Sequence, residues 1–328
     1  MGAVYENALR PILFRLSGDN AQKLGEINYT LGRPFWNLLG LTDKKYPQLE
    51  TEIAGIKIDN PIGLAAGYDK SCAFLDSMMA LGFGYVVGGT ITRYQRKGNP
   101  KPWIVRYTKE KSIVNSMGLP GSGAEKAAKN LRRYQTRDKP IIASIAGQNI
   151  NEWVECLRII EPLVDGIELN ISCPNLEEKR IYQELEGYEE LLVNLNRVRK
   201  KPLMTKMPRY DLKNQQELEK MMKLVDISER EGVDGLVFAN TLPVIEPQVG
   251  AGKGGKSGKA IFESTVEMVD YLSGKTKIPL TACGGISSAE NILRFGDKAR
   301  TFQLLTALVY EGPFVVREIK KSLAFPAN

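Results

Sequence analysis

The chain contains no histidine. Histidine is the side chain that most readily changes its charge near neutral pH, and it is the usual general base of enzymes. Without it, any proton abstraction must fall to cysteine, aspartate, glutamate, lysine, tyrosine or serine. If this protein is an enzyme that moves protons, it needs a less common base.

Cysteine is scarce, and long apolar runs are absent. The four cysteines, Cys72, Cys156, Cys173 and Cys283, form neither a Cys-x-x-Cys pair nor the spacing of a zinc site. No signal peptide is apparent, so we expect reduced thiols in a reducing compartment. No apolar run approaches the roughly 18 residues that a membrane-spanning helix needs. These features favour a cytoplasmic protein, with peripheral attachment to the inner face of a membrane as an alternative.

A block of charge of one sign is also missing. The net charge of +7 is spread along 328 residues. A solvated surface is therefore favoured over a nucleic-acid site, and no nucleic-acid partner is expected. The length allows one large barrel or two medium-sized domains.

Residues 1–45 are predicted to be an N-terminal helical extension. A first helix has its apolar side chains on one face, and Pro11 must lie in its first turn or kink it. Ser17 or Asp19 can cap a second helix, which Gly32-Arg33-Pro34 ends. This helical pair either packs on the main domain or forms an element that meets a membrane surface or a hydrophobic ligand.

Residues 46–328 are predicted to form a (β/α)8 TIM barrel, which belongs to the α/β class. A small hairpin turns at Ala54-Gly55, and strand-like and helix-like segments then alternate regularly. The expected strands are 62–65, 85–88, 141–145, 166–169, 203–206, 235–239, 280–282 and 301–304. Helical patterns between them include 188–200, 215–231 and 264–272.

The stretch Asn170-Ile171-Ser172-Cys173-Pro174-Asn175 follows the fourth expected strand. It holds a thiol at the C-terminal end of that strand, with an amide on either side. Amides orient a polar planar ligand, and a thiol can move a proton. In a barrel of this kind, function is found at the C-terminal ends of the strands.

Other strand ends carry small, amide or basic residues. A lysine at the end of an inward-facing strand, such as Lys206, is costly to bury unless an anion or an electron-rich ring meets it. Gly284-Gly285 follows the seventh strand and Thr306-Ala307 the eighth, which is the usual phosphate site of such barrels. A phosphorylated cofactor is therefore expected. Further candidates are Lys70 after the first strand, and Asn115 and residues 254–258 in expected loops.

Together these residues resemble the FMN-dependent dihydroorotate dehydrogenases of de novo pyrimidine (UMP) biosynthesis. The resemblance covers nearly the whole chain, and its motifs follow the family order. They are Asn60 to Lys70, Asn115 to Pro120, Asn170 to Asn175, Ala239 to Thr241, Cys283 to Ile286 and Leu305 to Pro313.

The resemblance implies a substrate site and a cofactor site. Dihydroorotate or orotate would be held by Lys70, Asn115, Met117, Gly118, Leu119, Asn170, Asn175, Asn240 and Thr241. FMN would be held by Ala66, Gly67, Lys70, Thr90, Ser144, Asn170, Lys206, Asn240, Gly258, Gly284, Gly285, Thr306 and Ala307. Lys206 would stabilise negative charge at the pyrimidine end of the flavin.

The mechanism that this implies is hydride transfer from C6 of dihydroorotate to flavin N5, with Cys173 as the base that removes the C5 proton. The reference pKa of a thiol, about 8.5, is far closer to neutrality than that of a serine hydroxyl. The alternative for Cys173 is an inert buried thiol. That interpretation is kept for the other three cysteines.

The resemblance is mixed with respect to the electron acceptor. The cysteine base is similar to class 1 enzymes, which use fumarate or an iron–sulfur partner. The N-terminal helices are similar to class 2 enzymes, which reduce quinone at a membrane. Asp59 stands where class 2 usually has Arg or Lys facing the quinone, Leu305 where it has Tyr, and Leu176-Glu177-Glu178 departs from the family in the loop over the substrate.

Quinone is the acceptor that the architecture favours, with a contact to the membrane through residues 1–45. Three alternatives stay open at the level of sequence. One is the same oxidation with fumarate or another soluble acceptor. The second is a related flavoenzyme that reduces another pyrimidine. The third is a degenerate, non-catalytic flavoprotein.

Overall fold

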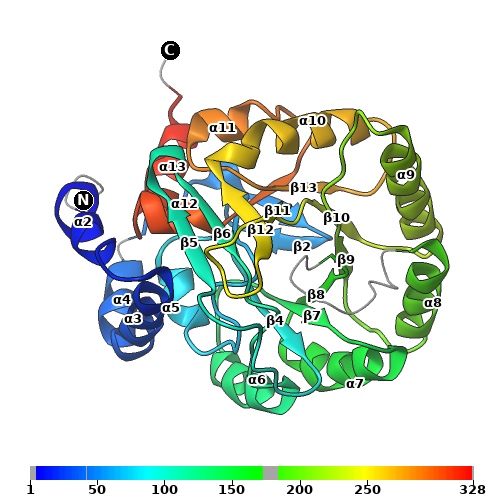
Figure 1. Cartoon of the computed structure of the whole chain (residues 1–328), viewed down its shortest axis with the longest axis horizontal. Coiled ribbons are helices and arrows are strands. Elements are labelled where there is room, and N and C mark those ends of the chain that lie inside the picture. Colours follow the sequence, from blue (N-terminus) through cyan, green and yellow to red (C-terminus); the bar gives the residue numbers. More distant parts are fainter. Residues whose placement is uncertain (1–4, 42, 173–183, 327–328) are drawn as a thin grey trace.

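Eight parallel strands close into a barrel at the centre of the molecule (Figure 1). The computed structural model describes residues 5–41, 43–172 and 184–326. The barrel strands are β3 (Ile62–Leu64), β4 (Tyr85–Thr92), β7 (Ile141–Ala146), β8 (Gly166–Asn170), β9 (Leu203–Lys206), β10 (Gly235–Phe238), β13 (Leu280–Cys283) and β14 (Thr301–Leu304). All eight lie where the sequence predicted them, so the predicted TIM barrel is confirmed.

Helices form a ring outside the barrel (Figure 1). They are α5 (Leu75–Ala80), α6 (Ala124–Leu131), α7 (Ile150–Ile160), α8 (Leu185–Asn196), α9 (Gln215–Arg230), α10 (Phe262–Leu272), α11 (Ala289–Leu293), α12 (Thr306–Tyr310) and α13 (Val315–Ala324). Short helical turns are η2 (Pro47–Leu49), η3 (Thr108–Glu110), η4 (Arg132–Tyr134), η5 (Glu161–Leu163) and η7 (Lys259–Ile261). Asn149 and Asn214 cap α7 and α9, since their side chains accept hydrogen bonds from first-turn N–H groups.

The predicted hairpin closes the N-terminal end of the barrel. Its strands are β1 (Thr51–Ile53) and β2 (Ile56–Ile58), and the turn at Ala54-Gly55 has positive φ at both residues. Ile53 and Ile58 pack against Tyr85 and Met204 in the barrel interior. With this end filled by apolar side chains, the open end is the one where the strands finish.

A four-stranded antiparallel sheet, which the sequence did not predict, lies at that open end. Its order is β11 (Leu242–Ile245), β12 (Lys253–Gly258), β6 (Ser112–Asn115) and β5 (Ile104–Tyr107). Asn115 and residues 254–258 were expected in loops, and that expectation was wrong. The glycine-rich run has no alternating side chains to mark a strand, and backbone pairing with β6, where Gly255 faces Asn115, supplies the order.

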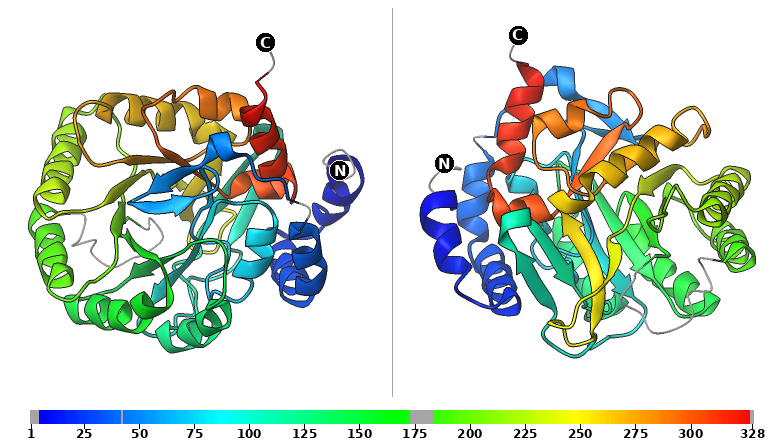
Figure 2. Two further views of the ribbon diagram at one scale, coloured as in Figure 1. Left: turned by 180° about the vertical axis from the view of Figure 1, so that it is seen from behind. Right: turned by 45° about the horizontal axis from the view of Figure 1, so that its top comes forward.

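The N-terminal helices lie against one side of the barrel (Figures 1 and 2). They are η1 (Tyr5–Leu9), α2 (Arg10–Leu13), α3 (Gly18–Leu31) and α4 (Arg33–Gly40). As predicted, Pro11 lies in a first turn and Ser17 caps α3. The third helix, α4, was missed. Pro34, taken as part of a terminator, lies in its first turn, where proline is well tolerated. No helix among the described residues is long and apolar enough to cross a membrane.

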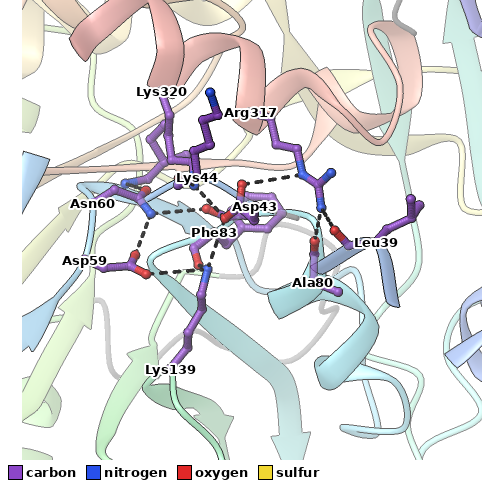
Figure 3. Close-up of polar contacts among 12 residues, drawn as sticks. Leu39, Asp43, Lys44, Asp59, Asn60, Ala80, Phe83, Lys139, Arg317 and Lys320 are labelled. Atoms are coloured by element: carbon purple, nitrogen blue, oxygen red, sulfur yellow. Dashed lines mark hydrogen bonds and ion pairs between the residues drawn. The ribbon is translucent and has the colours of Figure 1, made fainter. Parts of the chain in front are cut away.

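A cluster of charged residues fixes the chain after α4 to the barrel (Figure 3). The Asp43 carboxylate accepts a hydrogen bond of 2.7 Å from Lys320 Nζ and lies 3.8 Å from Lys139 Nζ. Lys139 also lies 3.7 Å from an Asp59 oxygen and donates to the carbonyl of Phe83. Asp59, Phe83 and Lys139 each precede a barrel strand, so this cluster belongs to the N-terminal end of the barrel.

Candidate active site at the strand ends

A cavity of ≈ 640 Å³ lies between the C-terminal ends of the strands and the N-terminal helices. This volume is in the range of cofactor and substrate sites. Most of the predicted site residues line it. They are Ala66, Gly67, Lys70, Thr90, Asn115, Met117, Gly118, Leu119, Asn170, Lys206, Asn240, Thr241, Gly258, Gly284, Gly285, Thr306 and Ala307.

A hydrogen-bonded chain of side chains crosses the floor of this cavity. Asn170 donates to Thr90 Oγ1 at 2.8 Å, and Thr90 Oγ1 lies 3.0 Å from Ser144 Oγ. Asn240 donates to Asn170 Oδ1 at 3.2 Å and to Ser172 Oγ at 2.9 Å. This hydrogen-bond network fixes which edge of each side-chain amide faces a ligand. Ser144 is fully buried behind Thr90 rather than in the cavity wall, so its contact with a cofactor stays a prediction.

Lys206 brings a buried positive charge to the cavity from the end of β9. Burial lowers the pKa of Lys206, but Cys283 and the Glu168 carboxylate outweigh that effect and raise it above its usual value. The side chain is therefore an ammonium ion at neutral pH. Glu168, itself fully buried, accepts a hydrogen bond of 2.9 Å from Gln303. The structure thus places a buried cation at the end of β9, where the sequence predicted one.

Cys283 also lines the cavity, although the sequence left it as an ordinary buried thiol. Its place at the end of β13 could have been noticed, because the neighbouring Gly284-Gly285 had already been assigned to the site. Cys72 and Cys156 are fully buried away from the cavity.

A turn suited to a phosphate lies beside Cys283. Gly284 and Gly285 have φ values of +138° and +76°, and Thr306 follows the adjacent strand β14. A Cβ at position 285 would lie 2.6 Å from Phe262 Cβ, so both conformation and space require glycine there. Free backbone N–H groups in such a turn form a concave anion site. The structure thus offers a place for the phosphate of the predicted cofactor.

The other wall of the cavity is apolar and comes from the N-terminal helices. Leu9, Ile12 and Leu13 line the cavity together with Leu305 of the barrel. Arg106 lies at its edge, where its guanidinium stacks over the Phe14 ring at 4.4 Å from the centroid. The sequence predicted that residues 1–45 either pack on the main domain or meet a membrane or a hydrophobic ligand, but it did not show which of their side chains reach the cavity.

Three residues or segments depart from the family pattern: Leu305 lines the cavity, Asp59 does not lie there, and residues 176–178 fall outside the described residues. The resemblance placed Asp59 at a position that faces the quinone, but it lies at the N-terminal end of the barrel, in the charged cluster. The reason is that it precedes β3, whereas the cavity lies where strands finish. Cys173, Asn175 and the altered residues 176–178 are not among the described residues, so their roles stay predictions.

Comparisons with known proteins agree with this geometry. A family model described as dihydroorotate dehydrogenase matches residues 48–325. A dihydroorotate dehydrogenase (quinone) of Coxiella burnetii is 31% identical and aligns over 96% of this chain and 95% of its own length. One from Methylococcus capsulatus is 31% identical over 98% and 99%.

Solved structures show the same fold. The dihydroorotate dehydrogenase of Eimeria tenella in complex with ferulenol has a TM-score of 0.76, with 23% identity. The match covers 89% of this chain and 90% of that one. The ligand-free form of the Eimeria enzyme superimposes with a TM-score of 0.77.

Proposed function

Because the chain belongs to the dihydroorotate dehydrogenase family of FMN-dependent oxidoreductases, we propose that it oxidises dihydroorotate to orotate with Cys173 as the base. The observation that carries this proposal is one cavity in which Lys70, Asn170 and Asn240 converge with Lys206. These are the residue types that a flat, anionic, hydrogen-bonding ring requires. A site of amides and lysines would leave its polar groups unpaired around an apolar ligand.

The residues present fit FMN. The Gly284-Gly285 turn with Thr306 would take the phosphate, and Ala66, Gly67 and Thr90 would border the ring system. Bound FMN supplies the two-electron acceptor for the hydride that leaves C6 of dihydroorotate. The Lys206 ammonium would stabilise negative charge at the pyrimidine end of the ring.

The chain's own residues would handle substrate orientation and the proton. Asn170 and Asn240 present fixed amide edges to the pyrimidine. The Cys173 thiolate would take the proton from C5, becoming a thiol that later releases this proton to solvent. A thiolate fits this task in a chain that lacks histidine.

We propose a quinone as the electron acceptor. Relatives that align over nearly their whole length are named as quinone-dependent. The apolar wall that the N-terminal helices form suits a hydrophobic ring. Leu31 and Leu38 on these helices and Leu41 directly after α4 are 77%, 64% and 83% exposed, which fits peripheral contact with the inner face of a membrane.

Anaerobic reduction of the flavin tests the first half of this proposal. The purified holoenzyme should lose its yellow colour when dihydroorotate is added without oxygen. Cys173→Ala should keep FMN and orotate binding but reduce at least a hundredfold more slowly, as loss of a general base predicts. A holoenzyme with bound FMN that dihydroorotate does not bleach would refute the activity.

An acceptor panel tests the second half. Decylubiquinone, a menaquinone analogue, fumarate and NAD would each be offered to the enzyme after reduction by dihydroorotate. We expect rapid reoxidation by the quinones. Faster reoxidation by fumarate or NAD would refute the quinone assignment and leave the first half-reaction in place.

A further inference from the structure

Glu26 reaches from the N-terminal extension into the cavity and meets Lys70. Its Oε1 lies 3.6 Å from Lys70 Nζ, and both residues line the cavity. Gln22, one turn earlier on α3, donates a hydrogen bond of 2.7 Å to the same oxygen. The carboxylate is therefore held in place from its own helix while it faces a lysine of the barrel.

The buried charge of Lys70 depends on this contact with Glu26. Its Nζ is buried and has no hydrogen-bond acceptor within range among the described residues. Asp69 is adjacent in sequence, but its two carboxylate oxygens accept hydrogen bonds from the backbone N–H groups of Ala73 and Phe74. In the part of the chain that is described, Glu26 forms the ion pair that offsets the burial of the lysine.

We propose that Glu26 is a positioning residue that holds the Lys70 ammonium while the substrate site is empty and yields it to an anionic substrate. This inference rests on the proposed function, which places an anionic pyrimidine against Lys70. A second anion near the same ammonium ion is repelled by Glu26, so the carboxylate weakens substrate binding while keeping Lys70 charged and extended.

The contact also links the substrate site to the helices over the apolar wall. An anion bound at Lys70 weakens the ion pair between Lys70 and Glu26 and so weakens the attachment of α3 to the barrel. Because coupling between two equilibria is reciprocal, the attachment of α3 weakens the binding of the anion by the same factor. Substrate binding is thus expected to loosen α3, the helix that covers the acceptor side of the cavity. Tyr29 of the same helix packs on Phe74 and Tyr68, so α3 stays attached to the barrel.

The test is an orotate titration of the FMN holoenzyme, followed through the change in flavin absorbance. Glu26→Gln removes the charge and keeps the size, and it should bind orotate about tenfold more tightly than the wild type. Glu26→Asp keeps the charge and should stay within about threefold of the wild type. Glu50→Gln, at an exposed site near the other end of the barrel, is the matched control and should have no effect.

Two further measurements separate electrostatics from a general structural effect. The methyl ester of orotate is neutral, so its affinity should be the same in Glu26→Gln and the wild type. Hydrogen exchange of α3 amides should rise on orotate binding in the wild type and stay constant in Glu26→Gln. Equal or weaker orotate binding by Glu26→Gln would overturn the role of Glu26. No flavin response to orotate in the wild type would instead overturn the proposed function.

Discussion

Of the three cysteines that the structure describes, only Cys283 lines the cavity, and their reactivity should differ accordingly. Burial raises the pKa of Cys156 to about 12 and that of Cys72 well above its ordinary value. Since the thiolate is the reactive form, both should resist iodoacetamide in the native protein. Cys283, in the cavity wall, should react in the FMN-free protein and be protected by added FMN.

Peptide mass spectrometry of the native and denatured chain measures this difference. The denatured chain is the control, because all of its thiols should be modified. Modification of Cys156 as fast as that of Cys283 in the native protein would contradict the prediction. Equal labelling of Cys283 with and without FMN would contradict the place of the cofactor beside it.

Asp69 should make stability depend on pH. Burial raises its pKa from 3.8 to about 6, although hydrogen bonds from Phe74 and Ala73 oppose the shift. Between these pH values the folded protein holds a proton that the unfolded chain has released. Its stabilising contribution is therefore complete below about pH 4 and is lost as the pH rises through about 6, a change of up to about 3 kcal/mol.

Urea unfolding of the wild type and Asp69→Asn from pH 4.5 to 7.5 tests this. Both proteins share every other titrating group, so the difference between their free energies of unfolding isolates Asp69. That difference should fall by about 2 kcal/mol as the pH rises from 4.5 to about 7 and then level off. A difference that does not change with pH would show that Asp69 titrates normally.

At the scale of elements, Asp43 should fix the segment between α4 and the barrel to α13. Its carboxylate faces Lys139, Arg317 and Lys320; the Lys320 side chain is buried, and that of Asp43 is 9% exposed. Asp43→Asn removes one of the two carboxylates of this cluster and leaves Asp59, which lies near Lys139 alone, with three cations (Figure 3). Loss of one partner of a buried ion pair typically costs about 3–5 kcal/mol, and we expect that loss in the free energy of unfolding.

The matched control for Asp43 is Asp297→Asn, since Asp297 is exposed. FMN content per folded molecule should be unchanged in both variants, because the cluster lies at the other end of the barrel from the cavity. Stabilities of the two variants within about 0.5 kcal/mol of each other would show that the cluster is not a stabilising contact.

The elements also show how far sequence reasoning reaches. The barrel strands were predictable because strands of a parallel sheet are buried on both faces and appear as short apolar runs, such as Ile141–Ala146. The antiparallel sheet was not, because Lys253–Gly258 has no apolar pattern and depends on pairing with a distant segment. Glu26 was not predicted either, because no local pattern indicates that α3 contributes a side chain to the cavity at the strand ends.

The same limit applied to Asp59. Its place in the family motif was clear from the sequence, but the end of the barrel that it occupies was assigned wrongly. Motifs that follow a strand, such as Ala66-Gly67 and Gly284-Gly285, were placed correctly because their strands fix which end of the barrel they reach. Whether a residue precedes or follows a strand is thus a better guide to its place in the site than whether it lies next to a family motif.

At the scale of the whole molecule, apolar side chains gather on the N-terminal helices. Leu31, Leu38 and Leu41 are mostly exposed, so changing all three to Gln removes apolar surface without opening the core. Burying a leucine in a lipid surface contributes about 1.5–3 kcal/mol, so the triple variant should bind vesicles at least a hundredfold more weakly. Co-sedimentation with vesicles of phosphatidylethanolamine and phosphatidylglycerol measures this.

The triple variant should affect only the half-reaction that takes place at the membrane. Bleaching of the flavin by dihydroorotate needs only the cavity, so the triple variant and the wild type should reduce at the same rate. Reoxidation by a long-chain quinone embedded in vesicles should slow in the variant, while reoxidation by a short-chain quinone in solution should not. Leu293→Gln, a change to an exposed leucine on α11, is the control. Equal vesicle binding by wild type and triple variant would mean that this apolar surface is not how the enzyme reaches a membrane.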